Sequence, residues 1–226
     1  MNQKRIFTDE IFLPENTWNK KFIDLSSSFR DITIGSQGGE AGVVQAIFRH
    51  CKPQNKFCVE VGASDGYDCS NTWQLIDEHG WSSLQIEILP HLYEQLTERH
   101  KNNPKVKCIN DKLERENFDK ILSANEVPEN FDLLSLDIDS YEYEVWKNLA
   151  DYKPNLVVIE GNAFEYDLSV INYDPSYSVV TNSRGYGSAT VGLYLRLAEI
   201  KGYSHICTLR QNSFFIRKEF EKGLLK

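Results

Sequence analysis

No stretch of the 226-residue sequence contains the roughly 20 consecutive apolar residues that a membrane-spanning helix requires. Positive charge is also scarce, because 25 lysines and arginines are outnumbered by 33 acidic residues, which gives a net charge of -8. Nucleic acids and anionic membranes are bound by basic surfaces, so neither is expected as the main partner. The N-terminus turns acidic before the apolar core of a signal peptide could form, and we therefore expect a cytoplasmic protein.

The cysteines show neither a C-x-x-C spacing nor an even count. Structural zinc sites and disulfide frameworks depend on such spacing or pairing, so neither is predicted. Three of the five cysteines lie in apparent strands, where a thiol behaves as a small apolar side chain. The sequence therefore predicts free thiols in a reducing compartment, at Cys51, Cys58, Cys69, Cys108 and Cys207.

The composition is that of an ordinary globular domain, with 41% hydrophobic and 26% charged residues. Residues 1–36 show no clear periodicity and are too short to bury a core of their own. We therefore expect an N-terminal arm or cap over residues 1–36, followed by a single domain over residues 37–226.

From residue 38 onward, short apolar runs alternate with helical patterns, which predicts right-handed βαβ units and a mostly parallel sheet. The last two strands form a hairpin, predicted as the antiparallel edge of that sheet. Residues 161–187 interrupt the alternation, and an irregular stretch of this length is typical of a functional loop. Helices are predicted over residues 38–51, 70–79, 90–100, 114–123, 141–149 and 188–201, and strands over 57–61, 83–87, 106–109, 131–137, 156–160, 203–209 and 213–217.

Residues 57–66 join a buried-strand pattern to a turn that contains two glycines. Gly62 and Gly66 lack a Cβ atom, so the backbone can turn tightly there and approach a ligand closely. Open α/β sheets build small-molecule sites from this order of strand, turn and helix. The glycine spacing differs from G-x-G-x-x-G, so phosphate binding is not specifically indicated. The segment therefore predicts a site for a nucleotide-like cofactor.

Acidic side chains follow four of the predicted strands, at Glu60, Glu87, Asp137 with Asp139, and Glu160. Any one of them alone could be a helix cap or a solvated residue. Because the carboxyl ends of parallel strands meet at one edge, however, we expect these carboxylates to converge. Clustered carboxylates need cations or hydrogen-bond donors to coexist, and Glu87 is placed to accept hydrogen bonds from ribose hydroxyls.

Several segments together resemble the FkbM-type family of class I S-adenosylmethionine-dependent methyltransferases. The likeness covers roughly residues 36 to 218 and implies a Rossmann-like sheet of seven strands whose last strand is antiparallel. Two positions depart from the family pattern: Ser64 replaces a common glycine, which a negative φ would tolerate, and Ala41 stands where an acid is common. The matching segments are residues 36–42, 59–66, 70–72, 134–139 with Tyr143 and Trp146, 157–162, 202–203 and 212–217.

The resemblance implies S-adenosylmethionine as the cofactor. Its methionine part is expected against Glu60 and Gly62, its ribose on Glu87, and its adenine near Asn110 and Asp111. The complete set of cofactor contacts expected on this basis is Gln37, Glu40, Glu60, Gly62, Ser64, Asp65, Asn71, Thr72, Glu87, Asn110, Asp111 and Asp137.

The resemblance also implies methyl transfer to a small polar acceptor, a hydroxyl of a sugar or nucleotide-linked sugar in bacterial polysaccharide or natural-product biosynthesis. Asp137, Asp139, Glu160 and Asn162 are the expected catalytic residues. The first three could also hold Mg²⁺, which would lower the pKa of a hydroxyl and orient it. Alternatively, Asp137 binds the ammonium group of the cofactor and the others hold loops. The expected acceptor contacts are Tyr141, Tyr166, Arg184 and Tyr186.

Other interpretations stay open. The acids would also suit a methyltransferase that acts on the nitrogen of a small amine, and a Rossmann-like scaffold could bind a nucleotide without chemistry. The N-terminal arm and the aromatic residues of the 161–187 segment could support a homodimer. An NAD-dependent dehydrogenase is disfavoured, because the sequence lacks both the phosphate-binding glycine pattern and a Tyr-x-x-x-Lys arrangement. No histidine is expected to be catalytic, since none follows a strand together with a partner.

Overall fold

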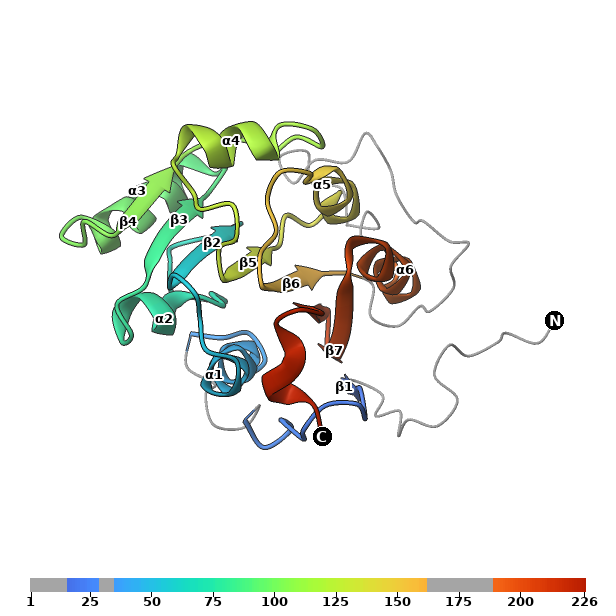
Figure 1. The fold of residues 1–226 in the computed structure, drawn as a ribbon. Helices are drawn as coiled ribbons and strands as arrows, with labels where there is room; N and C mark the ends of the chain where they lie inside the picture. Colours follow the sequence, from blue (N-terminus) through green and yellow to red (C-terminus); the bar gives the residue numbers. More distant parts are fainter. Residues whose placement is uncertain (1–15, 29–34, 162–188) are drawn as a thin grey trace.

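The computed structural model describes residues 16–28, 35–161 and 189–226, and within these ranges eight strands form one sheet (Figure 1). The strands are β1 (Asn16–Trp18), β2 (Phe57–Val61), β3 (Ser82–Ile86), β4 (Val106–Ile109), β5 (Leu133–Leu136), β6 (Leu156–Glu160), β7 (Tyr203–Leu209) and β8 (Asn212–Arg217). They lie in the order β1-β7-β8-β6-β5-β2-β3-β4. The central strands β2 to β6 are mutually parallel, and β8 runs antiparallel to both of its neighbours.

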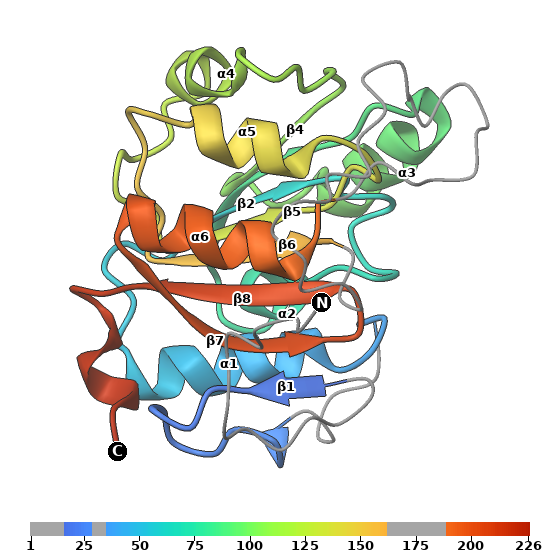
Figure 2. The ribbon, with the colours of Figure 1, turned by 90° about the vertical axis from the view of Figure 1, so that its right-hand side faces the viewer.

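Helices cover both faces of the sheet (Figure 2). One apolar cluster joins one face to α1 and α2, and a second cluster joins the other face to α4, α5 and α6. Within the described ranges, every helix is too short or too polar to cross a bilayer. The helices are α1 (Glu40–His50), α2 (Trp73–Asp77), α3 (Pro90–His100), α4 (Phe118–Ala124), α5 (Glu142–Asn148) and α6 (Val191–Lys201), and a short 3-10 helix spans Glu221–Leu224.

The sheet has one strand more than the seven predicted. β1 comes from the N-terminal segment and pairs antiparallel with β7 at the edge of the sheet. Nearby, Phe22 and Leu25 are buried in the same cluster as α1, so this part of the expected arm extends the sheet and its core. Whether a domain boundary falls at residue 36 stays a prediction.

The predicted C-terminal hairpin is present on the antiparallel side of the sheet, but β1 rather than the hairpin forms the outermost strand there. After α6 the chain enters β7, and the following strand β8 returns between β6 and β7. This arrangement is possible because the helical crossover from β6 leaves room for one strand, which the hairpin fills. β8 therefore lies inside the sheet, and its first residue is next to the end of β6.

The register of the parallel strands aligns their carboxyl ends. Val61 pairs with Ile86 on one side and with Leu136 on the other, and Leu136 pairs with Ile159. The residues that follow β2, β3, β5 and β6 consequently lie along one edge of the sheet. This edge contains the acidic positions that the sequence predicted to converge.

Candidate cofactor and catalytic site

The turn after β2 packs directly against the end of β5. Gly62 has φ +76°, and a Cβ atom added to it would lie 1.9 Å from the carbonyl oxygen of Asp137. The backbone N–H groups of Gly62 and Ala63 both donate to the carbonyl of Ile86, at 3.0 and 3.1 Å. Gly62 also borders a cavity. The backbone after β5 therefore already requires glycine at position 62, whether or not a ligand also approaches this turn.

Ser64 has φ +51°, so the negative φ that would make serine tolerable in place of glycine is not present. Its backbone N–H donates to a carboxylate oxygen of Glu87 at 2.8 Å, which holds the turn in this conformation. The other oxygen of Glu87 accepts from the backbone N–H of Leu89 at 2.8 Å. Glu87 is only 4% exposed and joins the turns that follow β2 and β3.

A cavity of about 250 Å³ opens between these turns and the end of β5. Its wall combines carboxylates with apolar side chains, a mixture that suits a ligand with an apolar ring and a polar or charged part. A more open groove of about 930 Å³ elsewhere, along residues 119–130 and 150–153, contains none of the predicted site residues. The cavity is lined by Val61, Gly62, Ser64, Ile86, Glu87, Ile88, Leu89, Leu92, Asp111, Lys112, Leu113, Asp137, Ile138, Asp139, Ser140 and Tyr141.

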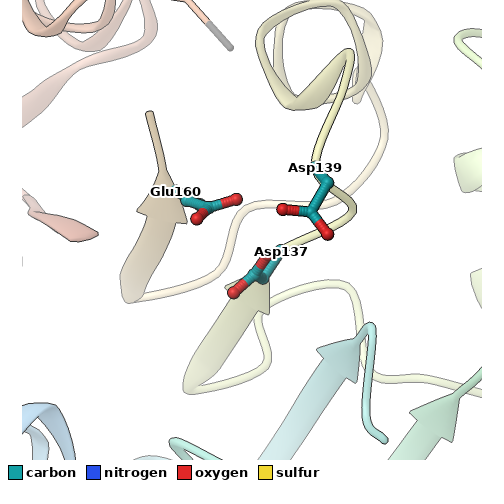
Figure 3. A group of neighbouring side chains, drawn as sticks. All are labelled: Asp137, Asp139 and Glu160. Atoms are coloured by element: carbon teal, nitrogen blue, oxygen red, sulfur yellow. The ribbon is translucent and has the colours of Figure 1, made fainter. Parts of the chain in front are cut away.

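Three predicted catalytic acids lie together at the ends of β5 and β6 (Figure 3). Asp137, Asp139 and Glu160 each place a carboxylate oxygen within 4.8 Å of the others. Burial raises the pKa of Asp137 and of Glu160, and the charge of Asp137 raises that of Glu160 further. Two buried carboxyl groups this close repel each other when both are charged, so a bound cation would favour their charged forms.

Glu142 supports this cluster and was not predicted from the sequence. Its carboxylate accepts from the backbone N–H groups of Ile138 and Ser140, at 2.9 and 3.0 Å. These groups flank Asp139, whose φ of +55° is uncommon for a residue other than glycine. Glu142 is fully buried, and burial raises its pKa to about 7. In the sequence it resembles any acid in the first turn of a helix, so no separate signal marked it.

Glu60 lies behind the cavity wall and does not line the cavity. It is 3% exposed and accepts hydrogen bonds from the hydroxyls of Ser70 (2.7 Å) and Thr72 (2.6 Å) and from the backbone N–H of Asn71 (2.7 Å). The structure brings these predicted cofactor residues together. Their hydrogen bonds join the end of β2 to the segment before α2, and none of these residues lines the cavity.

Three other predicted cofactor residues also lie outside the cavity wall. Gln37 is exposed, and its carbonyl accepts from the guanidinium of Arg210 at 3.1 Å. Glu40 is buried and accepts from the hydroxyl of Ser36 at 2.8 Å. Asp65 accepts from two backbone N–H groups of its own turn, at 2.8 and 2.9 Å. A direct contact of each with the cofactor stays a prediction.

The end of β4 contributes to the cavity in two ways. Asn110 donates from its amide to the carbonyls of Glu87 and Ile88, at 2.8 and 3.0 Å, and so fixes the neighbouring turn. Asp111 lines the cavity itself. Tyr141, predicted as an acceptor contact, also lines this cavity, and its hydroxyl donates to the carbonyl of Leu113. The remaining predictions, at Asn162, Tyr166, Arg184 and Tyr186, lie outside the described residues.

No family model and no curated protein matches the sequence. Solved structures do match. The methyltransferase domain of bacterial CtHen1-C has a TM-score of 0.50 and 13% identity, over 78% of this chain and 96% of that one. Magnesium protoporphyrin IX methyltransferase (ChlM) from Synechocystis PCC 6803, solved with bound S-adenosylmethionine, has a TM-score of 0.50 and 10% identity, over 81% and 80%. Although the FkbM-type resemblance stays a prediction, the chain has the Rossmann-like fold of class I methyltransferases.

Proposed function

We propose that the protein is an S-adenosylmethionine-dependent methyltransferase that acts on a hydroxyl of a small polar acceptor, a sugar or a nucleotide-linked sugar. One observation carries the proposal. The glycine turn after β2, the carboxylate of Glu87 and the acids at the end of β5 border a single cavity at the carboxyl edge of the sheet. Ligands of open α/β sheets bind at this edge. Two proteins of similar fold are methyltransferases, and one was solved with S-adenosylmethionine bound.

The charge of the cavity supports the same cofactor. Glu87, Asp111, Asp137 and Asp139 all line the cavity, whereas its basic residue, Lys112, forms an ion pair with Glu114 at 2.7 Å. S-adenosylmethionine carries a sulfonium and an ammonium group against one carboxylate, so an acidic cavity favours it. The two phosphates of NAD would be repelled by the same carboxylates.

The acids at the end of β5 supply the chemistry that an oxygen nucleophile needs. A sugar hydroxyl becomes an effective nucleophile as its proton is removed. In the proposed step the hydroxyl oxygen attacks the methyl carbon, the bond from this carbon to sulfur breaks, and the hydroxyl proton passes to Asp139. Asp139 is exposed, as a base that meets an acceptor must be, and Glu142 holds its turn. S-adenosylhomocysteine is then the leaving group.

A divalent cation would fit the same acids. Asp137, Asp139 and Glu160 offer hard oxygen ligands within 4.8 Å of one another, the type that Mg²⁺ prefers. Bound there, the cation would lower the pKa of the acceptor hydroxyl. We predict that a chelator reduces methyl transfer and that added Mg²⁺ restores it. The same pair of assays with an amine that is neutral at the assay pH, and so needs no such activation, is the control. Full transfer to a hydroxyl in the chelator would rule out the metal.

The acid cluster also favours one second candidate, transfer to the nitrogen of a small amine, because carboxylates bind an ammonium group well. Hydroxyl and amine acceptors are separated by assaying sugars, nucleotide-linked sugars and small amines with methyl-labelled S-adenosylmethionine. The favoured reaction would belong to polysaccharide or natural-product biosynthesis in a bacterial cytoplasm. That location and a homodimeric state stay predictions.

Calorimetric titration of the purified protein with S-adenosylmethionine, S-adenosylhomocysteine and NAD tests the cofactor directly. We expect the two sulfur compounds to bind with dissociation constants in the range of about 1 μM to 1 mM that is usual for enzyme ligands. NAD should bind much more weakly, because its phosphates meet the carboxylates of the cavity. Binding of NAD without binding of S-adenosylmethionine would refute the proposal and favour a dinucleotide-binding scaffold.

A further inference from the structure

The first residue of β8 lies directly opposite the last residue of β6. Asn212 pairs with Glu160 in this antiparallel register, so the two side chains lie on the same face of the sheet and close together. Both are buried, at 4% and 7% exposed. Within the described part of the chain, neither Oδ1 of Asn212 nor Oε2 of Glu160 has a hydrogen-bond partner.

Glu40, at the start of α1, provides a third buried oxygen that lacks a hydrogen-bond partner among the described residues. This oxygen is Oε1, and Glu40 is 1% exposed. Alternation along the strands places Glu160 and Asn212 on the face of Val158 and Phe214, which share an apolar cluster with α1. The charge of Glu40 also contributes, after burial and Asp139, to the raised pKa of Asp137. Glu40 therefore lies near the same strand ends.

The turn between β7 and β8 holds Asn212 in position. The carbonyl of Gln211 accepts from the backbone N–H of Gly161 at 2.8 Å, which ties the turn to the end of β6. Arg210 donates to the carbonyl of Gln37 at 3.1 Å, which ties the same turn to the loop before α1. These two contacts tie the residues that precede Asn212 to the end of β6 and to the loop before α1.

Buried oxygens without donors are costly, and each one in a native structure requires an explanation. We infer that Asn212, together with Oε2 of Glu160 and Oε1 of Glu40, binds the ammonium group of the methionine part of the cofactor, beyond the wall of the cavity that holds the rest of it. This inference rests on the proposed function. An ammonium group has three N–H donors, one for each of the three oxygens, and its charge offsets that of the carboxylates. Water molecules could instead donate to these three oxygens, and the experiment below distinguishes bound water from the ammonium group.

Two ligands that differ in the amino-acid part test the assignment. S-adenosylhomocysteine carries the ammonium group, and 5′-methylthioadenosine lacks the amino-acid part but keeps the adenosine and the sulfur. We expect Asn212→Leu, which removes the amide at similar size, to weaken S-adenosylhomocysteine binding by about tenfold, as loss of a hydrogen bond to a charged group does. Binding of 5′-methylthioadenosine should change less than about twofold. Asn212→Asp keeps an acceptor oxygen and should retain S-adenosylhomocysteine affinity.

The other outcomes are equally informative. Unchanged S-adenosylhomocysteine binding in Asn212→Leu means that only water meets these oxygens, and equal losses for both ligands assign Asn212 to the fold. Either result overturns the inference. If the leucine variant does not fold, as judged by its thermal unfolding, Asn212→Ala, which also removes the amide, provides the same comparison. Failure of the unmodified protein to bind either ligand instead refutes the proposed function, which is a separate result.

Discussion

Replacing Gly62 with alanine is expected to abolish S-adenosylmethionine binding and to destabilise the protein far more than the same change at Gly202. The two glycines have similar backbone conformations, with φ +76° and +81°, so both alanine variants pay the cost of a left-handed residue, about 1–2 kcal/mol. At Gly202 a Cβ atom would meet nothing within 4 Å. At Gly62 it would lie 1.9 Å from the carbonyl oxygen of Asp137, and relieving that overlap adds roughly 1–3 kcal/mol.

The clash also reaches the site. Asp137 donates from its backbone N–H to the carbonyl of Val61 at 3.2 Å, so pushing its carbonyl away separates the ends of β2 and β5 and displaces the acid cluster. Urea unfolding of both variants measures the difference in stability, and calorimetric titration measures cofactor affinity. Gly202→Ala should bind S-adenosylmethionine like the unmodified protein. Equal stability of the two variants would contradict the role assigned to the contact between Gly62 and Asp137.

The sequence was most informative about buried strands. β2, β4, β6 and β7 begin and end where their apolar runs predicted. For β2 and β6 the reason is that parallel strands covered on both faces have little room for polar residues. The βαβ order then placed their carboxyl ends at one edge. The convergence of Asp137, Asp139 and Glu160 follows from topology alone, and the structure confirms it.

Elements that depend on tertiary contacts were missed or misplaced. β1 has three residues and exists because β7 offers it an edge, so no local pattern marks it. α2 was expected from residue 70 but begins at Trp73. The hydroxyl of Ser70 accepts from the backbone N–H groups of Thr72 and Trp73, at 3.2 and 3.1 Å, and so ends the preceding turn before the helix starts.

The sequence also could not predict the structural role of each individual acidic residue. Glu60 and Glu87 both follow the same strand-end pattern, yet Glu87 lines the cavity whereas Glu60 turns behind its wall. Glu142 fixes the turn of Asp139 although it lies in an ordinary first helical turn. The role of each acid depends on the direction of the backbone N–H groups in a neighbouring turn. Residue spacing does not reveal that direction.

Asp139→Asn is expected to reduce methyl transfer to a hydroxyl acceptor by about 10²–10⁴-fold, the usual contribution of a general base, while changing S-adenosylmethionine affinity less than severalfold. The substitution is conservative in shape, and asparagine tolerates the left-handed conformation that this position adopts, at φ +55°. The hydrogen bonds from Ile138 and Ser140 to Glu142 involve backbone N–H groups and should persist. The turn is therefore retained and only the basic carboxylate is lost.

Glu126→Gln is the matched control, because Glu126 is an exposed acid at φ +58° in the turn after α4, outside the cavity wall. It tests whether loss of one negative charge at a left-handed position affects transfer by itself. Equal losses of affinity and turnover in Asp139→Asn would instead make Asp139 a cofactor residue. A normal rate with an amine that is neutral at the assay pH and a reduced rate with a hydroxyl acceptor would assign Asp139 to activation of the hydroxyl, as a base or as a cation ligand, since a neutral amine attacks without prior loss of a proton.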